Sequence, residues 1–144
     1  MVDNYSKTDP TKRIVAFIVD ALVYLVIYIF LFFWARVGDY FAWILAGGYL
    51  LVKDGLHSGQ SLGKKVFGLR VVNVDMKRPG DITDSVKRNL IFFIPGLFRF
   101  VPFLGSLIAT VVFAIELYFI FNDVQGLRWG DNFARTMVVE EKID

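Results

Sequence analysis

The stretch RIVAFIVDALVYLVIYIFLFFW, residues 13–34, decides the fold of this chain of 144 residues. After Arg13 comes an apolar run of 21 residues, Ile14 to Trp34, in which Asp20 is the one charged residue. As a helix this run would be about 31 Å long, close to the thickness of the hydrocarbon core of a bilayer. A carboxylate at that depth costs roughly 2.5–3.5 kcal/mol. We therefore predict a membrane-spanning helix with Asp20 as a buried ionisable site; the alternative is a charge that snorkels or is merely tolerated.

The composition also points to a membrane. The chain is 56% hydrophobic and 17% aromatic, with a mean hydropathy of +0.52, which is outside the usual balance of a soluble domain. The net charge of +2 is too small to indicate a nucleic-acid partner. No cysteine is present, which excludes thiol catalysis and disulfides. The first apolar run exceeds the length of a signal-peptide core, and Trp34-Ala35-Arg36 is not a cleavage site, so we expect it to be retained.

Further apolar segments follow the first. We predict an all-α membrane protein, a small bundle of about four transmembrane helices in a single domain over residues 1–144, with the lipid bilayer as its partner. The expected spans are 14–34, 37–53, 86–101 and 103–121, with a loop at 54–85 and a tail at 122–144. The third span is expected to be broken at Pro95-Gly96. The pair Gly47-Gly48 in the second would let another helix approach closely.

Two segments outside these spans have the composition of strands. They are KVFGLRVVNVD, residues 65–75, and RTMVVEE, residues 135–141, and both are rich in β-branched residues. We expect them to pair in a short cytoplasmic β-hairpin-like element, with Val71 and Val72 close to Val138 and Val139. Asp131 would lie in the turn before the second strand, where it would orient that turn, cap backbone amides, or pair with Arg70 or Arg128.

The positive charges predict the topology. Fourteen of the sixteen Lys and Arg residues lie in the leader up to Arg13, in residues 53–88 and in the tail, and only Arg36 and Arg99 remain. By the positive-inside rule, four spans would place both termini and the long loop in the cytoplasm, with the protein integral to the plasma (inner) membrane. The alternative is a protein of three spans, with residues 86–101 lying in the interface and the tail outside.

Three carboxylates fall at a similar predicted depth. Asp20 would lie about 9 Å, and Glu116 about 7.5 Å, from the same cytoplasmic boundary, at which Asp54 ends the second span. With Arg13 as a counter-charge, these acids could form one ion- or proton-binding site for a shared proton or a small monovalent cation. The alternative is a structural Arg13–Asp20 pair, with Glu116 bonded to backbone or tyrosine hydroxyl groups.

Arg13 and Asp20 are seven residues apart and share one helix face. Their separation of roughly 10 Å along the helix axis is long for a direct contact. We therefore expect a bridged link, or a partner from another helix for each residue, with Lys53 or Asp54 as the partner of one of them.

Three parts of the chain together resemble the RDD family of small membrane proteins. They are RIVAFIVD at 13–20, GQSLGKKVFGLRVV at 59–72 and GLRWGDNFARTMVV at 126–139, and the middle one is similar to the family's GQTLGKRLLGLRVV-like stretch. The resemblance implies that the family's defining triplet is Arg13, Asp20 and Asp131. It also implies a cytoplasmic motif made of Gly59, Gln60, Gly63, Lys64, Gly68 and Arg70. Phe133-Ala134-Arg135 stands where the family usually has Leu-Ala-Gly. Transport, including cation/proton exchange, has been suggested for the family.

Other chemistry is not indicated. Residues 59–65, GQSLGKK, have the wrong glycine spacing for a phosphate loop. His57 is the one histidine and has no clustered partners, so we expect no metal site. No nucleophile–base pair is visible, and we expect neither catalysis nor a cofactor.

Two hypotheses of function remain. The first is a small homo-oligomeric transporter or exchanger of protons and monovalent cations, with Asp20 and Arg13 central. The second is a non-transporting membrane scaffold or assembly module that docks partners through its basic cytoplasmic face. Neutralising Asp20 would distinguish them, because only transport predicts lost function with intact folding.

Overall fold

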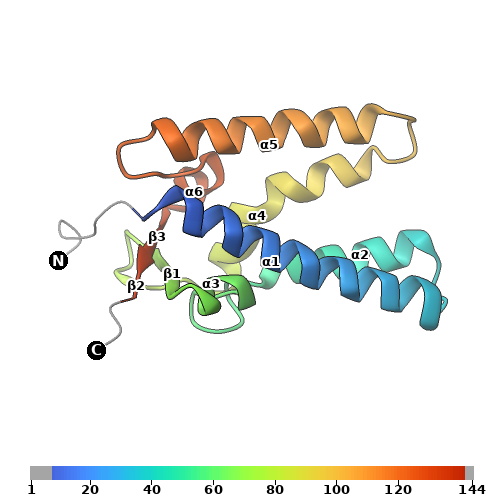
Figure 1. The fold of residues 1–144 in the computed structure, drawn as a ribbon, viewed down its shortest axis with the longest axis horizontal. Helices are drawn as coiled ribbons and strands as arrows, with labels where there is room; N and C mark the ends of the chain where they lie inside the picture. The colour runs from blue at the N-terminus through green and yellow to red at the C-terminus, as the bar shows by residue number, and fades with distance from the viewer. Residues whose placement is uncertain (1–7, 142–144) are drawn as a thin grey trace.

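The computed structural model describes residues 8–141, and Figure 1 shows long helices extending away from a small sheet. The helices are α1 (Pro10–Ile29), continued by the π-helical turn η2 (Phe30–Trp34), then α2 (Asp39–Val52), α3 (Leu62–Val66), α4 (Ile82–Leu97), α5 (Leu104–Asn122) and α6 (Trp129–Ala134). The strands are β1 (Leu69–Asn73), β2 (Arg78–Pro79) and β3 (Thr136–Glu140). The predicted helical fold is therefore accompanied by a sheet at one end.

Helix α1 begins with a side-chain cap. The Asp9 side chain accepts a hydrogen bond from the backbone N–H of Thr11, and Pro10 occupies the first turn, where its missing N–H costs nothing. The helix continues through η2 to Trp34. Arg36 and Gly38 then take positive φ angles of 52° and 86°, which turns the chain back into α2.

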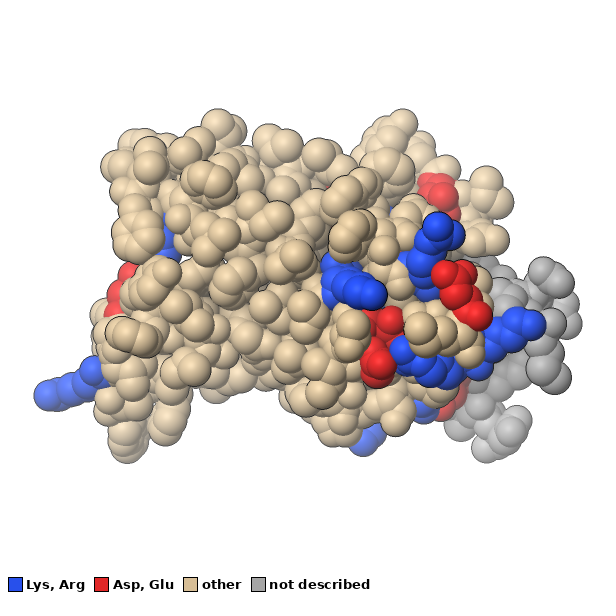
Figure 2. All heavy atoms as spheres, turned by 180° about the vertical axis from the view of Figure 1, so that it is seen from behind, with Lys and Arg blue, Asp and Glu red and all other residues tan. Residues whose placement is uncertain are grey.

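Two helices are long and apolar enough to cross a membrane. These are residues 10–34, with a mean hydropathy of 2.7, and α5, with 2.1. Only 11% of the most apolar stretch of each is buried within the protein, whereas the core helix of a soluble protein would be mostly buried. In Figure 2 charged side chains gather at the end that carries the sheet, a few lie at the opposite end, and a broad uncharged surface separates them. The two exposed apolar helices and this distribution of charge point to a membrane protein.

The other two expected spans are shorter helices. Helix α2 has 14 residues. Helix α4 begins at Ile82 with a capping box between Asp81 and Asp84, so its first turns are polar. The expected break at Pro95-Gly96 is wrong, because α4 runs through both residues to Leu97. Pro95 lies in the last turn, and because it has no N–H, one i→i−4 hydrogen bond of the helix is missing there.

Glycines let α2 and α4 pack closely. A Cβ on Gly47 would lie 2.8 Å from the ring of Phe93, while one on Gly96 would overlap the ring of Trp43. The two rings stack with their centroids 4.6 Å apart. The expectation that the Gly47-Gly48 pair admits another helix is confirmed at Gly47; a Cβ on Gly48 would meet open space.

The predicted pairing of the strand-like segments is confirmed, in a larger sheet than a hairpin. The strand order is β2-β1-β3, with antiparallel neighbours. Val71 lies opposite Val138, while Val72 faces Met137 and Val139 faces Arg70. Strand β2 is an edge strand of two residues, which suits Pro79 because it has no N–H to donate. Ala16 of α1 packs with Leu69, Val71 and Val138 in the hydrophobic core, so α1 rests on the sheet.

The topology can be tested with single cysteines, because the chain has none of its own. We expect Lys77→Cys and Val124→Cys to react with a membrane-impermeant maleimide from the cytoplasmic side only, and Arg36→Cys from the outer side only. All three positions are exposed, so accessibility depends on the side of the membrane. Labelling of Val124→Cys from outside would instead support the three-span arrangement.

Candidate ion site

Asp20 is completely buried and accepts three hydrogen bonds. The donors are Lys53 Nζ at 2.7 Å, Ser61 Oγ at 2.6 Å and the backbone N–H of Gly63 at 2.8 Å. A buried carboxylate persists only when it is paired and hydrogen-bonded in this way. The expectation that Lys53 partners one of the two first-helix charges is confirmed. Asp20 does not pair with Arg13, so that structural alternative is wrong.

The predicted cytoplasmic motif folds against α1. Ser61 caps α3 by accepting the backbone N–H of Lys64 at 3.2 Å. A Cβ on Gly63 would overlap the carbonyl oxygen of Ala16 and lie 3.1 Å from Asp20 Oδ1. Only glycine therefore lets this backbone come close enough to donate to Asp20.

The remaining motif residues connect the loop to the sheet. Gln60 Nε2 donates to Leu69 O at 3.0 Å. Arg70 donates to Ser58 O at 2.8 Å, not to Asp131. Gly59 and Gly68 have φ angles of 90° and 62°, which favour glycine at the two bends. These residues shape the loop, and of the motif only Gly63 and Lys64 touch buried carboxylates.

Asp54 is held by a second group of donors. Lys64 Nζ forms an ion pair with it, Asn89 Nδ2 donates at 3.2 Å, and Arg88 Nε lies 3.6 Å away. Burial acts to raise the pKa of Asp54, but the charges of Lys64 and Arg88 outweigh it and hold that pKa well below its usual value. Burial, opposed by Asp54, lowers the pKa of Lys64 to about 7.

Asp131 is the carboxylate on which three arginines converge. Arg13 Nη2 lies 2.5 Å from it, Arg88 Nη2 is in ion-pair contact, and Arg128 Nη2 is 3.6 Å away. The backbone N–H of Arg128 also donates to it at 3.1 Å. Burial opposes ionisation, but the charges of Arg88, Arg128 and Arg13 hold the pKa of Asp131 far below its usual value. Of the partners expected for Asp131, Arg128 is present and Arg70 is not.

Glu116 lies beside the group formed by Asp131 and its three arginines, which we call the arginine side of the network. Its Oε1 accepts the backbone N–H of Gly130 at 3.2 Å, and Oε2 lies 3.7 Å from Arg128 Nε. The expected backbone bond to Glu116 is therefore present. No single carboxylate site forms: Asp20 and Asp54 meet lysines, whereas Glu116 faces arginine.

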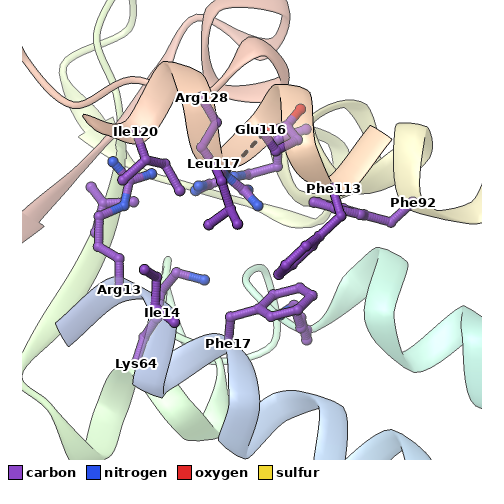
Figure 3. A pocket seen from close by; sticks show the side chains of 13 residues that line it. Arg13, Ile14, Phe17, Lys64, Phe92, Phe113, Glu116, Leu117, Ile120 and Arg128 are labelled. Atoms are coloured by element: carbon purple, nitrogen blue, oxygen red, sulfur yellow. Dashed lines mark ion pairs between the residues drawn. The ribbon is translucent and has the colours of Figure 1, made fainter. Parts of the chain in front are cut away.

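A small cavity lies between the helices beside these charges (Figure 3). Its volume is about 40 Å³, and side chains of α1, α4 and α5 surround it. The dashed line in Figure 3 joins Arg128 and Glu116 at its edge. Within residues 8–141, no group of three or more His, Cys, Asp or Glu residues is arranged to hold a metal ion.

Sequence reasoning missed the roles of Arg88 and Lys64 at the carboxylates. Arg88 stands directly before the uncharged run that begins at Asn89, as Arg13 stands before Ile14. The position of an arginine at the entrance of an apolar helix was therefore the signal available for Arg88, as it was for Arg13. The partner of each could not be read from the sequence, since the contacts join distant segments.

The comparisons with known proteins support a family assignment. The sequence model described as the RDD family matches residues 7–135. No curated protein and no solved structure gave a significant match to the chain.

The fit between residues 59–65 and α1 yields a stability prediction. We expect Gly63→Ala to lower the free energy of unfolding by about 1–3 kcal/mol, because its Cβ would collide with the Ala16 carbonyl group. Gly48→Ala is the matched control, since a Cβ there meets open space. Thermal unfolding in detergent would measure both; equal midpoints would contradict the close packing.

The pH dependence of stability follows from Asp131. Because its folded-state pKa lies below the unfolded value of about 3.9, its stabilisation is complete above about pH 4 and is lost as pH falls toward the folded-state pKa. We expect Asp131→Asn to lower the free energy of unfolding by about 3–5 kcal/mol at neutral pH, because it leaves buried arginines unpaired. The variant should also lose less of its remaining stability than the wild type as the pH falls. Glu140→Gln, in an exposed pair with Lys12, is the control and should cost less than about 1 kcal/mol. Unfolding midpoints measured between neutral and acid pH would test this.

Proposed function

The chain belongs to the RDD family, and on that premise we propose that it exchanges protons for small monovalent cations across the plasma (inner) membrane. One observation carries the proposal. Asp20, completely buried in the longest apolar helix, has a lysine as its charged partner. Intramembrane ionisable residues commonly mark ion or proton pathways.

The exchange follows from the oxygens around Asp20. Its Oδ2 accepts hydrogen bonds from Lys53 Nζ and Ser61 Oγ, and carboxylate and hydroxyl oxygens are hard ligands that suit an alkali cation. A cation bound there would displace the ammonium group of Lys53. One proton and one cation are then alternative occupants of this site, and the exchange is electroneutral.

The same argument gives the arginine side a different role. Asp131 is neutralised by groups that keep their charge at all physiological pH values. We propose that Arg13 and Asp131 hold the helices in place rather than carry the ion. Because the helical bundle is small, a complete ion path would need a homo-oligomer, with both termini and the loop in the cytoplasm.

The test is flux in proteoliposomes made from a defined lipid mixture, with an internal pH dye and a panel of monovalent cations. We expect the wild type to acidify or alkalinise the lumen in response to a cation gradient, and Asp20→Asn to fold but show no exchange. Lys53→Arg should also lose exchange, because a guanidinium group pairs with a carboxylate through two N–H groups and would be harder for a cation to displace from Asp20. Lys65→Arg, an exposed change in the same loop, is the matched control and should retain it.

A second candidate is a membrane scaffold without transport. It is favoured by the pairing observed here, since Asp20, Asp54, Asp131 and Glu116 each have a cationic partner, as a purely structural network would. The proposed exchange at Asp20 is wrong if Lys53→Arg exchanges as well as the wild type, or if Asp20→Asn fails to fold while Glu116→Gln has no effect. Either result would support the scaffold instead.

A further inference from the structure

The cavity beside the buried charges has an unusual lining. Helix α5 contributes Phe113, Leu117 and Ile120, so one wall is apolar. Its charged lining consists of five cations and one acid: Arg13, Lys53, Lys64, Arg88, Arg128 and Glu116. A volume of 40 Å³ holds about three water molecules, since each needs roughly 10–15 Å³ measured in this way. The space suits a small ion.

Below about pH 7, where Lys64 is protonated, the charges around the cavity do not cancel. Lys53 and Lys64 pair with Asp20 and Asp54, and Asp54 also lies 3.6 Å from Arg88. The three arginines, Arg13, Arg88 and Arg128, bring only two further carboxylates, Asp131 and Glu116. Because arginine keeps its proton, this side carries one surplus positive charge. A buried surplus charge is costly without a counter-ion.

The arginines also leave donors without acceptors. Arg88 is completely buried; its Nη2 pairs with Asp131 and its Nε lies 3.6 Å from Asp54, but Nη1 has no hydrogen-bond partner among residues 8–141. Arg128 Nε, 3.7 Å from Glu116 Oε2, also makes no hydrogen bond to these residues. Buried donors of this kind are rare in native proteins, and each calls for a partner. Both side chains line the cavity.

We propose that this cavity binds one small monovalent inorganic anion of the chloride class among the guanidinium groups of Arg13, Arg88 and Arg128. One negative charge balances the surplus, and its acceptor capacity satisfies the unpartnered donors. A divalent anion would leave an excess of negative charge, and a larger organic anion would not fit. The rings of Phe17, Phe92 and Phe113 line the same cavity and limit water, which strengthens the attraction.

Glu116 is the one acid in the cavity lining, and removing its charge should strengthen anion binding. Glu116 Oε2 makes no hydrogen bond to the described residues and lies beside Arg128, where it competes with an anion for the same guanidinium group. Glu116→Gln keeps an oxygen that can accept the Gly130 N–H but removes the charge. The site then gains a second surplus positive charge, and anion affinity should rise.

The experiment is a chloride titration of the purified full-length protein in a neutral detergent. Sodium gluconate replaces sodium chloride at constant sodium concentration and ionic strength, so the proposed cation exchange is held constant. We expect calorimetry to show saturable binding with a 1:1 stoichiometry, and the unfolding midpoint to rise with chloride. Bromide should compete, and sulfate should not. Glu116→Gln should lower the Kd for chloride at least about tenfold.

A matched pair of variants on α5 separates this site from general salt effects. Leu117→Phe fills the cavity and should abolish the chloride response, while Ile115→Phe adds the same ring on an exposed face and should leave it unchanged. The proposal is overturned if gluconate and chloride stabilise equally, if Leu117→Phe binds chloride as the wild type does, or if Glu116→Gln weakens binding. These outcomes do not bear on exchange at Asp20.

Discussion

The carboxylate of Asp131 gathers three arginines from separate parts of the chain. Arg13 comes from the start of α1, Arg88 from α4 and Arg128 from the residue before α6. A Cβ on Gly130 would overlap the carbonyl oxygen of Arg88, so α6 lies directly against α4. Three buried like charges repel one another unless a shared anion holds them together. The junction of the helices and the tail therefore depends on this one acid.

The two sides of the network differ in how their charge can vary. Around Asp131 the cations are arginines, and their charge is fixed. Around Asp20 and Asp54 they are Lys53 and Lys64, and the pKa of Lys64 is lowered to about 7, so its charge changes near neutral pH. Fixed charge suits the assembly of helices, and variable charge suits proton-coupled chemistry. Under the proposed exchange, this division separates the residues that hold the helices from those that would bind the ion.

The sequence was informative where local rules decide the structure. The length of the first apolar run predicts a long helix, and the β-branched composition of two segments predicts strands; both predictions are confirmed. Lys53 could be anticipated as a partner because it ends the second apolar run. The continuation of α4 through Pro95 could not be anticipated from the sequence, because it depends on where the helix ends and on how Gly96 packs against Trp43. Nor could the contacts of Arg13 and Arg88 with Asp131, because both arginines lie more than forty positions from it along the chain.

The buried charges also explain why the loop after α2 cannot be an ordinary solvated connection. Asp20 is completely buried within a candidate membrane-spanning helix, and two of its three donors come from this loop: Ser61 and Gly63. The loop must therefore reach α1, and a glycine is required because a side chain would meet the helix backbone. Strand β1, which follows, is then held beside α1, where β3 pairs with it. The sheet is thus positioned by the need of one intramembrane carboxylate for hydrogen bonds.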